Sequence, residues 1–128
     1  MPQELHALMN LSLAVELLHN FTLIHDDIMD KDTIRHSQKT IHHKWDISTA
    51  ILAGDGIYTI AQLILSSTDG CNNQIMRCFN EVTLDICEGQ ALDKEFENSN
   101  VISEKLYFEM IKKKTGSLIA ASAMLPSI

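Results

Sequence analysis

The chain has 128 residues, 45% of them hydrophobic and 21% charged, a balance that favours a globular fold over a disordered chain. Its formal net charge of −7 disfavours nucleic acid and anionic membranes as partners. Three cysteines, Cys71, Cys78 and Cys87, form neither an even set nor a CxxC pair, so we expect reduced core residues in a cytoplasmic protein. No segment has the pattern of a secretion signal, and no 18 apolar residues run without a break, so we expect no membrane span.

The helical segments follow from the spacing of apolar residues. Both prolines, Pro2 and Pro126, lie at the ends of the chain, so nothing between them forbids long helices. The sequence therefore predicts an all-α protein, with Ser103 as the N-cap of its last helix. The expected helices cover approximately residues 3–29, 47–65, 72–92 and 103–125, and the polar stretches 31–41 and 93–102 are expected to be loops.

The first predicted helix carries three aspartates within one turn, Asp26, Asp27 and Asp30. They belong to a polar stripe that contains no lysine or arginine from Ser12 onward. An ordinary solvated face is also polar. However, these acids repel one another, and they lie at the helix end where the dipole disfavours anions, so they indicate a bound cation. Clustered carboxylates without a His or Cys partner suit Mg²⁺.

The segment from Leu23 to Asp30, LIHDDIMD, closely resembles the first aspartate-rich motif, DDxxD, of the trans-isoprenyl diphosphate synthases, or polyprenyl synthetases. The resemblance covers nearly the whole chain from Glu16 onward and is nearest to archaeal-type short-chain geranylgeranyl and farnesyl diphosphate synthases. Its other matching positions, in chain order, are Arg35, Thr40, His42, Ala50–Asp55, Gly89, Gln90, Asp93, Tyr107, Met110, Ile111 and Lys114–Gly116.

The resemblance implies a fold and a reaction. The fold is an antiparallel helix bundle of the isoprenoid synthase type. In the reaction, Mg²⁺ promotes ionisation of an allylic diphosphate, and the carbocation alkylates isopentenyl diphosphate to add five carbons. The resemblance also implies a cytoplasmic homodimer.

The resemblance assigns roles to the aspartates and to one arginine. Asp26, Asp27 and Asp30 match the Mg²⁺ ligands that bridge to the allylic diphosphate, and Asp26 and Asp27 are thereby implied in catalysis. Arg35 matches an arginine that grips this diphosphate, for which a guanidinium fork is suited.

Roles in the second half of the chain are implied in the same way. Lys114 and Thr115 match a KT pair whose lysine contacts the diphosphate, and Lys114 is implied in catalysis. Gln90 and Asp93 match a GQxxD segment that lines the cavity, and Gln90 is implied in diphosphate binding. From composition alone, Lys112–Lys114 would be a solvated helix surface, and Gln90 with Asp93 could be a helix end facing water.

Phe21 lies five positions before the first aspartate, with Thr22 beside it. The resemblance implies that these positions limit product length, and the bulky Phe21 ring implies a short product of C15 to C20. Two further features favour structural roles. Asp55, in an apolar run, is expected to be structural, and the adjacent His42 and His43 are expected to be loop residues and not a metal pair.

The chain departs from the family pattern in one loop and at both ends. Where the family has RRGxPT, residues 35–40 read RHSQKT, so His36 supplies less positive charge than arginine. The helices that bind isopentenyl diphosphate are expected before Met1, and the second aspartate-rich motif beyond Ile128. We therefore expect residues 1–128 to be the central part of one domain, an incomplete bundle whose uncovered apolar faces favour association, and not to elongate prenyl chains alone.

Two other functions stay open at this point. A non-catalytic subunit or interaction module of a prenyl synthase complex would account for the altered segment after Arg35. A terpene cyclase also uses an aspartate-rich metal site, but Gly89–Gln90 and Lys114–Thr115 argue against it.

Overall fold

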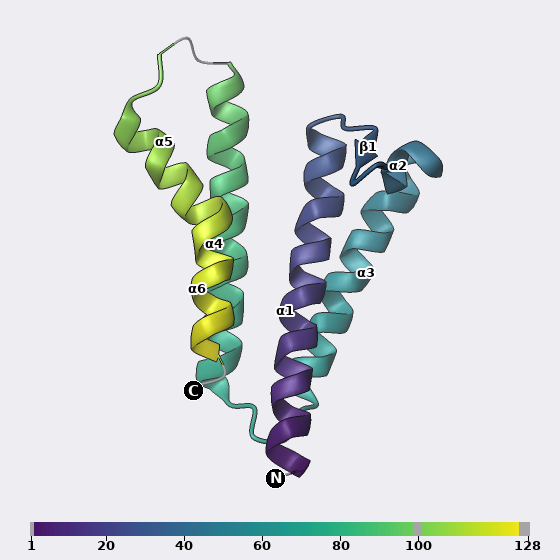
Figure 1. Ribbon diagram of the computed structural model, residues 1–128, viewed down its shortest axis with the longest axis vertical. Coiled ribbons are helices and arrows are strands. Elements are labelled where there is room, and N and C mark those ends of the chain that lie inside the picture. The colour runs from purple at the N-terminus through teal and green to yellow at the C-terminus, as the bar shows by residue number, and fades with distance from the viewer. Residues whose placement is uncertain (1, 99–100, 126–128) are drawn as a thin grey trace. The chain divides into compact units, whose positions relative to one another are not determined.

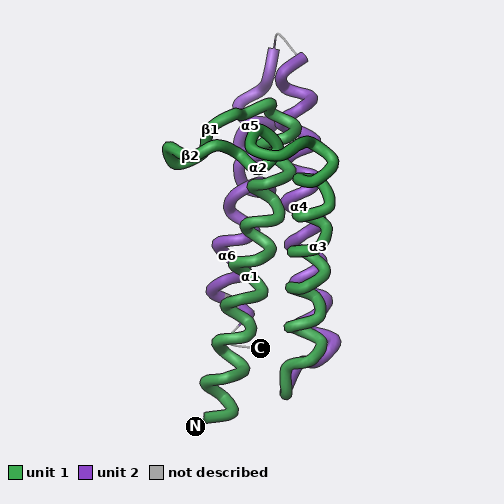
Figure 2. Tube along the Cα trace, turned by 90° about the vertical axis from the view of Figure 1, so that its right-hand side faces the viewer, with its two compact units in different colours: residues 1–69 green, residues 70–128 purple. Residues whose placement is uncertain are grey.

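The computed structural model describes residues 2–98 and 101–125, and the side chain of Met124 lies outside this description. The chain forms two compact units, residues 1–69 and 70–128 (Figure 2). Within the described residues, every element other than one short β-hairpin is a helix, which confirms the all-α prediction (Figure 1). Pro126 lies outside the described residues.

The first unit is built on two long antiparallel helices, α1 (Pro2–Met29) and α3 (Ile47–Ser66), which pack along each other (Figure 1). Small side chains at Ala14, Ala50 and Ala61 are fully buried and allow close contact, with Leu18 and Leu65 filling the remaining space. At the far end of the pair from the α1–α3 connection, the Asn10 amide donates to Thr68 Oγ1 at 3.1 Å. This pairing fixes the end of α1 that carries the three aspartates beside the start of α3.

The segment 31–41, expected to be a loop, contains a hairpin and leads into a one-turn helix. Strands β1 (Ile34–Arg35) and β2 (Gln38–Lys39) pair antiparallel, and α2 (Ile41–Lys44) follows. The turn between the strands holds His36 and Ser37 at φ of +50° and +64°. Glycine or asparagine usually occupies such positions, so the sequence carried no hairpin signal.

The second unit is built on α4 (Asn73–Glu97). This helix continues five residues beyond the predicted end, because Lys94 pairs with Glu97 at 3.1 Å and the charged residues at this end are good helix formers. The predicted loop at 93–102 was therefore wrong for its first half. Ile75, Phe79 and Ile86 of α4 are buried, at the helical spacing expected from the sequence.

The last predicted helix is divided into three parts, α5 (Glu104–Ile111), a π-helical segment η1 (Lys112–Gly116) and α6 (Ser117–Met124). A single α-helix over 103–125 was therefore not found. Ser103 is the N-cap of α5, as predicted, and its hydroxyl accepts a hydrogen bond from the Leu106 amide at 3.1 Å. The π-helical segment lies against α4, and this contact bears on the site described below.

One surface feature differs from expectation, and a second leaves an expectation untested. None of the three cysteines forms a disulfide, but Cys87 is exposed, so the prediction of core cysteines fails there. Two helices, Pro2–Met29 and Ile47–Ser66, are long and apolar enough to cross a membrane, and 17% of each apolar window is buried. Core helices of soluble proteins pass the same test, so this is weak support for a membrane span, and the expected absence of one stays a prediction.

Candidate functional site

An ion pair joins the acidic end of α1 to the hairpin. The Arg35 guanidinium donates from Nε to both carboxylate oxygens of Asp27, at 3.0 and 2.9 Å, and from Nη2 to Oδ1 at 2.7 Å. Asp27 is 5% exposed, so its buried charge has a bidentate partner. This hydrogen bonding raises the pKa of Arg35 above its usual value, with further contributions from the negative charges of Asp27, Asp32 and Asp26.

The hairpin holds Arg35 in place through its backbone. Arg35 pairs with Gln38 across the two strands, and the Thr40 amide donates to the Thr33 carbonyl at 3.0 Å. Thr40 is buried, and its hydroxyl donates to the Asp32 carbonyl at 2.9 Å. The guanidinium thus projects from a closed loop toward α1.

Asp26, Asp27 and Asp30 are the candidate metal ligands of the first unit. Among residues 2–98 and 101–125, no group of three or more His, Cys, Asp or Glu residues is gathered closely enough to hold a metal ion. Asp27 is turned to Arg35, whereas Asp26 lies in the last turn of α1 and Asp30 directly follows the helix, with its amide donating to the Asp26 carbonyl at 2.8 Å. Two carboxylates whose remaining coordination positions would go to water and phosphate oxygens are the donor set that Mg²⁺ usually takes, so Asp26 and Asp30 fit this ion.

His25 fills a notch in α3 next to the aspartates. Its Nε2 lies 3.3 Å from the Ile51 carbonyl and 3.6 Å from Asp55 Oδ1. A Cβ placed on Gly54 would lie 2.5 Å from His25 Cδ2, so only glycine leaves room for the imidazole. The Asp55 carboxylate is exposed, so it needs no partner to offset a cost of burial. Sequence patterns indicated no role for His25.

Phe21 and Thr22, the residues implied in chain length, lie on α1 one turn before the aspartates. The Phe21 ring packs edge-on against His25, with centroids 4.7 Å apart, and against the Tyr58 ring of α3 at 5.1 Å. The Thr22 hydroxyl donates to the His19 carbonyl at 2.7 Å. Phe21 is therefore held between α1 and α3, and the chain-length role of both residues stays a prediction.

In the second unit, two lysines of the π-helical segment reach acids of α4. Lys114 Nζ donates to Asp93 Oδ2 at 2.6 Å, and Lys113 Nζ donates to Glu88 Oε2 at 2.7 Å. The bond to Glu88 is the main reason that the pKa of Lys113 is raised. The run of lysines is therefore not a uniformly solvated surface, although Lys112 and Thr115 are exposed.

Gln90 is 5% exposed, and neither atom of its amide has a hydrogen-bond partner among the described residues. A buried amide without a partner costs stability, so such a group calls for a ligand or an ordered water. The structure thus brings Gln90, Asp93 and Lys114 onto facing elements of one unit. Each unit holds its own set of the implied residues.

The arrangement of these helices is that of isoprenoid synthases. The structure is similar to a geranylgeranyl pyrophosphate synthetase from Pyrococcus horikoshii (TM-score 0.88, 37% identity, 91% of this chain and 37% of that one). It also resembles a geranylgeranyl pyrophosphate synthetase from Geoglobus acetivorans (TM-score 0.84, 43% identity, 96% and 44% of the chains). The polyprenyl synthetase family model matches residues 1–128. The chain therefore belongs to the polyprenyl synthetase family, as its motifs predicted.

Curated relatives agree with this assignment. A geranylgeranyl pyrophosphate synthase from Geoglobus acetivorans is 47% identical over 120 residues, which are 91% of this chain and 38% of that protein. A geranylgeranyl diphosphate synthase from Methanosarcina mazei is 43% identical over 127 residues, 97% of this chain and 39% of that protein. The chain thus spans less than two-fifths of the length of either relative.

Proposed function

We propose that this chain forms part of a short-chain isoprenyl diphosphate synthase, in which Mg²⁺-dependent condensation of an allylic diphosphate with isopentenyl diphosphate gives a C15 to C20 product. The observation that carries the proposal is the acidic end of α1, where the Arg35 guanidinium is held by Asp27 and lies close enough to Asp26 to be influenced by its charge. The names of the relatives at 43–47% identity support the same reaction class. A cytoplasmic homodimer belongs to this proposal.

Each residue has a task in this proposal. Asp26 and Asp30 would hold Mg²⁺, which neutralises charge developing on the leaving diphosphate. Asp27 orients Arg35, which would supply fixed positive charge to a diphosphate in the first unit, and Lys114 would supply positive charge to a diphosphate in the second unit. Gln90 would direct its buried amide to the substrate, and Thr115 would contact the substrate from η1. Phe21 and Thr22 would limit product length.

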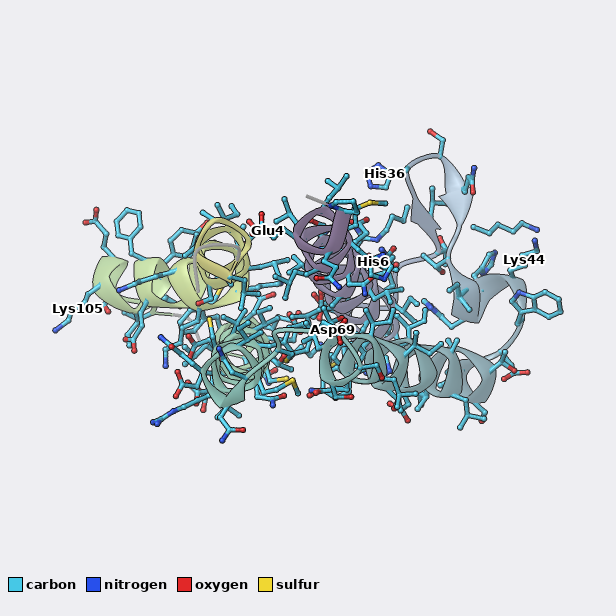
Figure 3. All side chains as sticks on the ribbon, turned by 90° about the horizontal axis from the view of Figure 1, so that it is seen from below. Glu4, His6, His36, Lys44, Asp69 and Lys105 are labelled. Atoms are coloured by element: carbon cyan, nitrogen blue, oxygen red, sulfur yellow. The ribbon has the colours of Figure 1, made fainter. Side chains whose placement is uncertain are left out.

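Binding of inorganic pyrophosphate in the presence and absence of Mg²⁺, measured by isothermal titration calorimetry, tests the half-site on α1. We expect Mg²⁺-dependent binding that is lost in Asp26→Asn and Asp30→Asn. Asp69→Asn is the matched control, because Asp69, labelled in Figure 3, follows the C-terminal end of α3, whereas the hairpin precedes the start of α3. Equal loss in all three variants would contradict the assignment.

The 128-residue chain by itself is proposed not to elongate prenyl chains. Incubation with Mg²⁺, geranyl diphosphate and isopentenyl diphosphate should give no longer product, and clear product would contradict this part. The alternative is a non-catalytic subunit, which the strained His36–Ser37 turn in place of an arginine and glycine favours. Failure of the unaltered chain to bind Mg²⁺ and pyrophosphate would support that alternative.

A further inference from the structure

The contact between α4 and the π-helical segment contains a glycine that cannot be enlarged. A Cβ placed on Gly89 would lie 2.5 Å from the Lys114 amide nitrogen, 2.7 Å from its Cα and 2.9 Å from its Cβ. Backbone atoms cannot rotate away as a side-chain end can, so any larger residue at position 89 must push the two elements apart. Gly89 therefore sets the distance between α4 and Lys114.

The π-helical geometry itself falls on the residues 112–116, with Lys114 at its centre. Such segments insert one extra residue into a turn, are rare, and are frequent at functional sites. The extra residue changes the direction in which the following side chains leave the helix. Here the change coincides with the point of closest approach to Gly89.

Asp93 lies one turn after Gly89 on α4 and receives the ammonium of Lys114 at 2.6 Å. The two side chains are 29% and 25% exposed, so the pair is partly shielded from water. Glu88, the residue before Gly89, holds Lys113 in a similar pair, but the Glu88 side chain is more exposed, at 47%. Lys113 and Lys114 are thus each held by a different acid, Glu88 and Asp93 respectively.

We propose that Gly89 and Asp93 are positioning residues for Lys114: Gly89 lets the π-helical backbone lie against α4, and Asp93 orients the ammonium group. The inference rests on the proposed function, in which Lys114 contacts the substrate diphosphate. It adds that a negatively charged residue increases affinity for a negatively charged ligand, because orientation of the lysine outweighs repulsion between the carboxylate and the diphosphate.

The direction of the change in affinity distinguishes orientation of Lys114 by Asp93 from a purely electrostatic effect of the Asp93 charge. Asp93→Asn should lower the affinity of the chain for Mg²⁺ with inorganic pyrophosphate about tenfold, the order of loss expected from misplacing one binding group. Asp93→Glu, which retains charge and pairing, should restore most of the affinity. If Asp93 acts only as a nearby negative charge, Asp93→Asn should instead raise the affinity, and that result would overturn the proposal.

A second measurement does not depend on ligand binding. In ¹H–¹⁵N spectra of lysine side chains, the Lys114 ammonium signal, assigned by its loss in Lys114→Arg, should broaden in Asp93→Asn and persist in the matched variant Glu88→Gln. Persistence in Asp93→Asn would overturn the proposal even if the unaltered chain bound no pyrophosphate. Absence of pyrophosphate binding with the expected spectra would count against the proposed function alone.

Gly89→Ala tests whether the close contact between α4 and the π-helical backbone positions Lys114. Gly56→Ala is its control, because a Cβ at the helical Gly56 would meet nothing within 4 Å. Gly89→Ala should shift or broaden the Lys114 signal, whereas Gly56→Ala should leave it unchanged. Identical spectra for the two variants would contradict the role of Gly89. If Gly89→Ala does not fold, the Asp93 variants still decide the orientation of the ammonium.

Discussion

At the scale of single residues, Arg35 has a structural partner before any substrate arrives. It directs two of its nitrogens at the buried carboxylate of Asp27, and the remaining N–H groups of the fork can be offered to another anion. An arginine held in this way loses less conformational freedom when it binds a diphosphate than a mobile one would. The pair therefore contributes to stability and, under the proposed function, to binding.

Arg35→Ala should lower the free energy of unfolding by about 1–3 kcal/mol, because it leaves the Asp27 carboxylate buried without its ion-pair partner. The figure is below that of a fully buried pair because the Arg35 side chain is 35% exposed. Urea unfolding monitored by circular dichroism measures it, and Asp27→Asn in the same background should recover part of the loss.

Arg77→Ala is the control for this prediction. Arg77 makes a hydrogen bond of similar length, 2.8 Å, to Glu81, but both side chains are largely exposed. Its removal should leave stability unchanged within error. Similar effects at Arg35 and Arg77 would show that burial of Asp27 is unimportant.

At the scale of elements, sequence patterns identified the long helices but not their interruptions. Apolar spacing located α1, α3 and α4 because each buries one face. The hairpin was missed because His36 and Ser37 adopt a conformation that their side chains disfavour. The π-helical segment was missed because the residue it packs against, Gly89, lies more than twenty residues away in the sequence.

The hairpin turn provides an element-scale prediction. Ser37→Gly should raise the free energy of unfolding by about 0.5 kcal/mol, because glycine adopts the φ of +64° without a steric penalty, although it costs more backbone entropy. Thermal unfolding checks this. Gln38→Gly, one residue further along in β2, should instead destabilise the chain, and a Ser37→Gly variant that behaves like it would contradict the assigned turn.

The N-cap of α3 gives a prediction about the pH dependence of stability. Asp46 accepts a hydrogen bond from the Thr49 amide, which lowers the pKa of Asp46 below its usual value near 3.8. Since the folded-state pKa is the lower one, this cap stabilises the protein fully above about pH 4 and progressively less as the pH falls below that value. Asp46→Ala should therefore lower the unfolding temperature at pH 7 by more than at pH 3.

Asn72 is a natural control for that experiment. It caps α4 in the same way, with Oδ1 accepting from the Ile75 amide at 3.0 Å, but its side chain does not titrate. Asn72→Ala should cost about 1 kcal/mol, with no difference between the two pH values. A matching pH dependence for both variants would rule out the carboxylate as the cause.

At the scale of the whole molecule, the family motifs predicted more of the candidate site than residue spacing did. Spacing placed Asp26, Asp27 and Asp30 on one turn, but it could not show that Asp27 faces an arginine eight residues later. Nor could it show that Gln90 is buried or that Asp93 meets Lys114, because these depend on packing between separate elements. The motifs singled out these residues and implied roles toward the substrate, but they did not predict these contacts.

Apolar side chains remain exposed on α3, including Leu52 at 70% and Leu63 at 59% exposure. Contiguous exposed apolar surface favours association, so the isolated chain should form oligomers or aggregates at micromolar concentration. Light scattering coupled to size-exclusion chromatography measures this. Leu52→Glu with Leu63→Glu should shift the chain toward monomer.

Gln74→Glu controls for the added charge, because Gln74 is an exposed polar residue of α4. It should leave the oligomer distribution unchanged. A shift toward monomer in this variant would attribute the effect to net charge and not to apolar surface.

The notch at Gly54 has a consequence for how this protein can vary. His25 occupies the space that a side chain at position 54 would need, and Phe21 packs on the imidazole from its own helix. A larger residue at position 54 therefore requires that the imidazole moves or that position 25 becomes smaller. Positions 25 and 54 are therefore coupled, and a larger residue at position 54 alone would press on the His25 side chain, which belongs to the turn of α1 that carries Asp26 and Asp27.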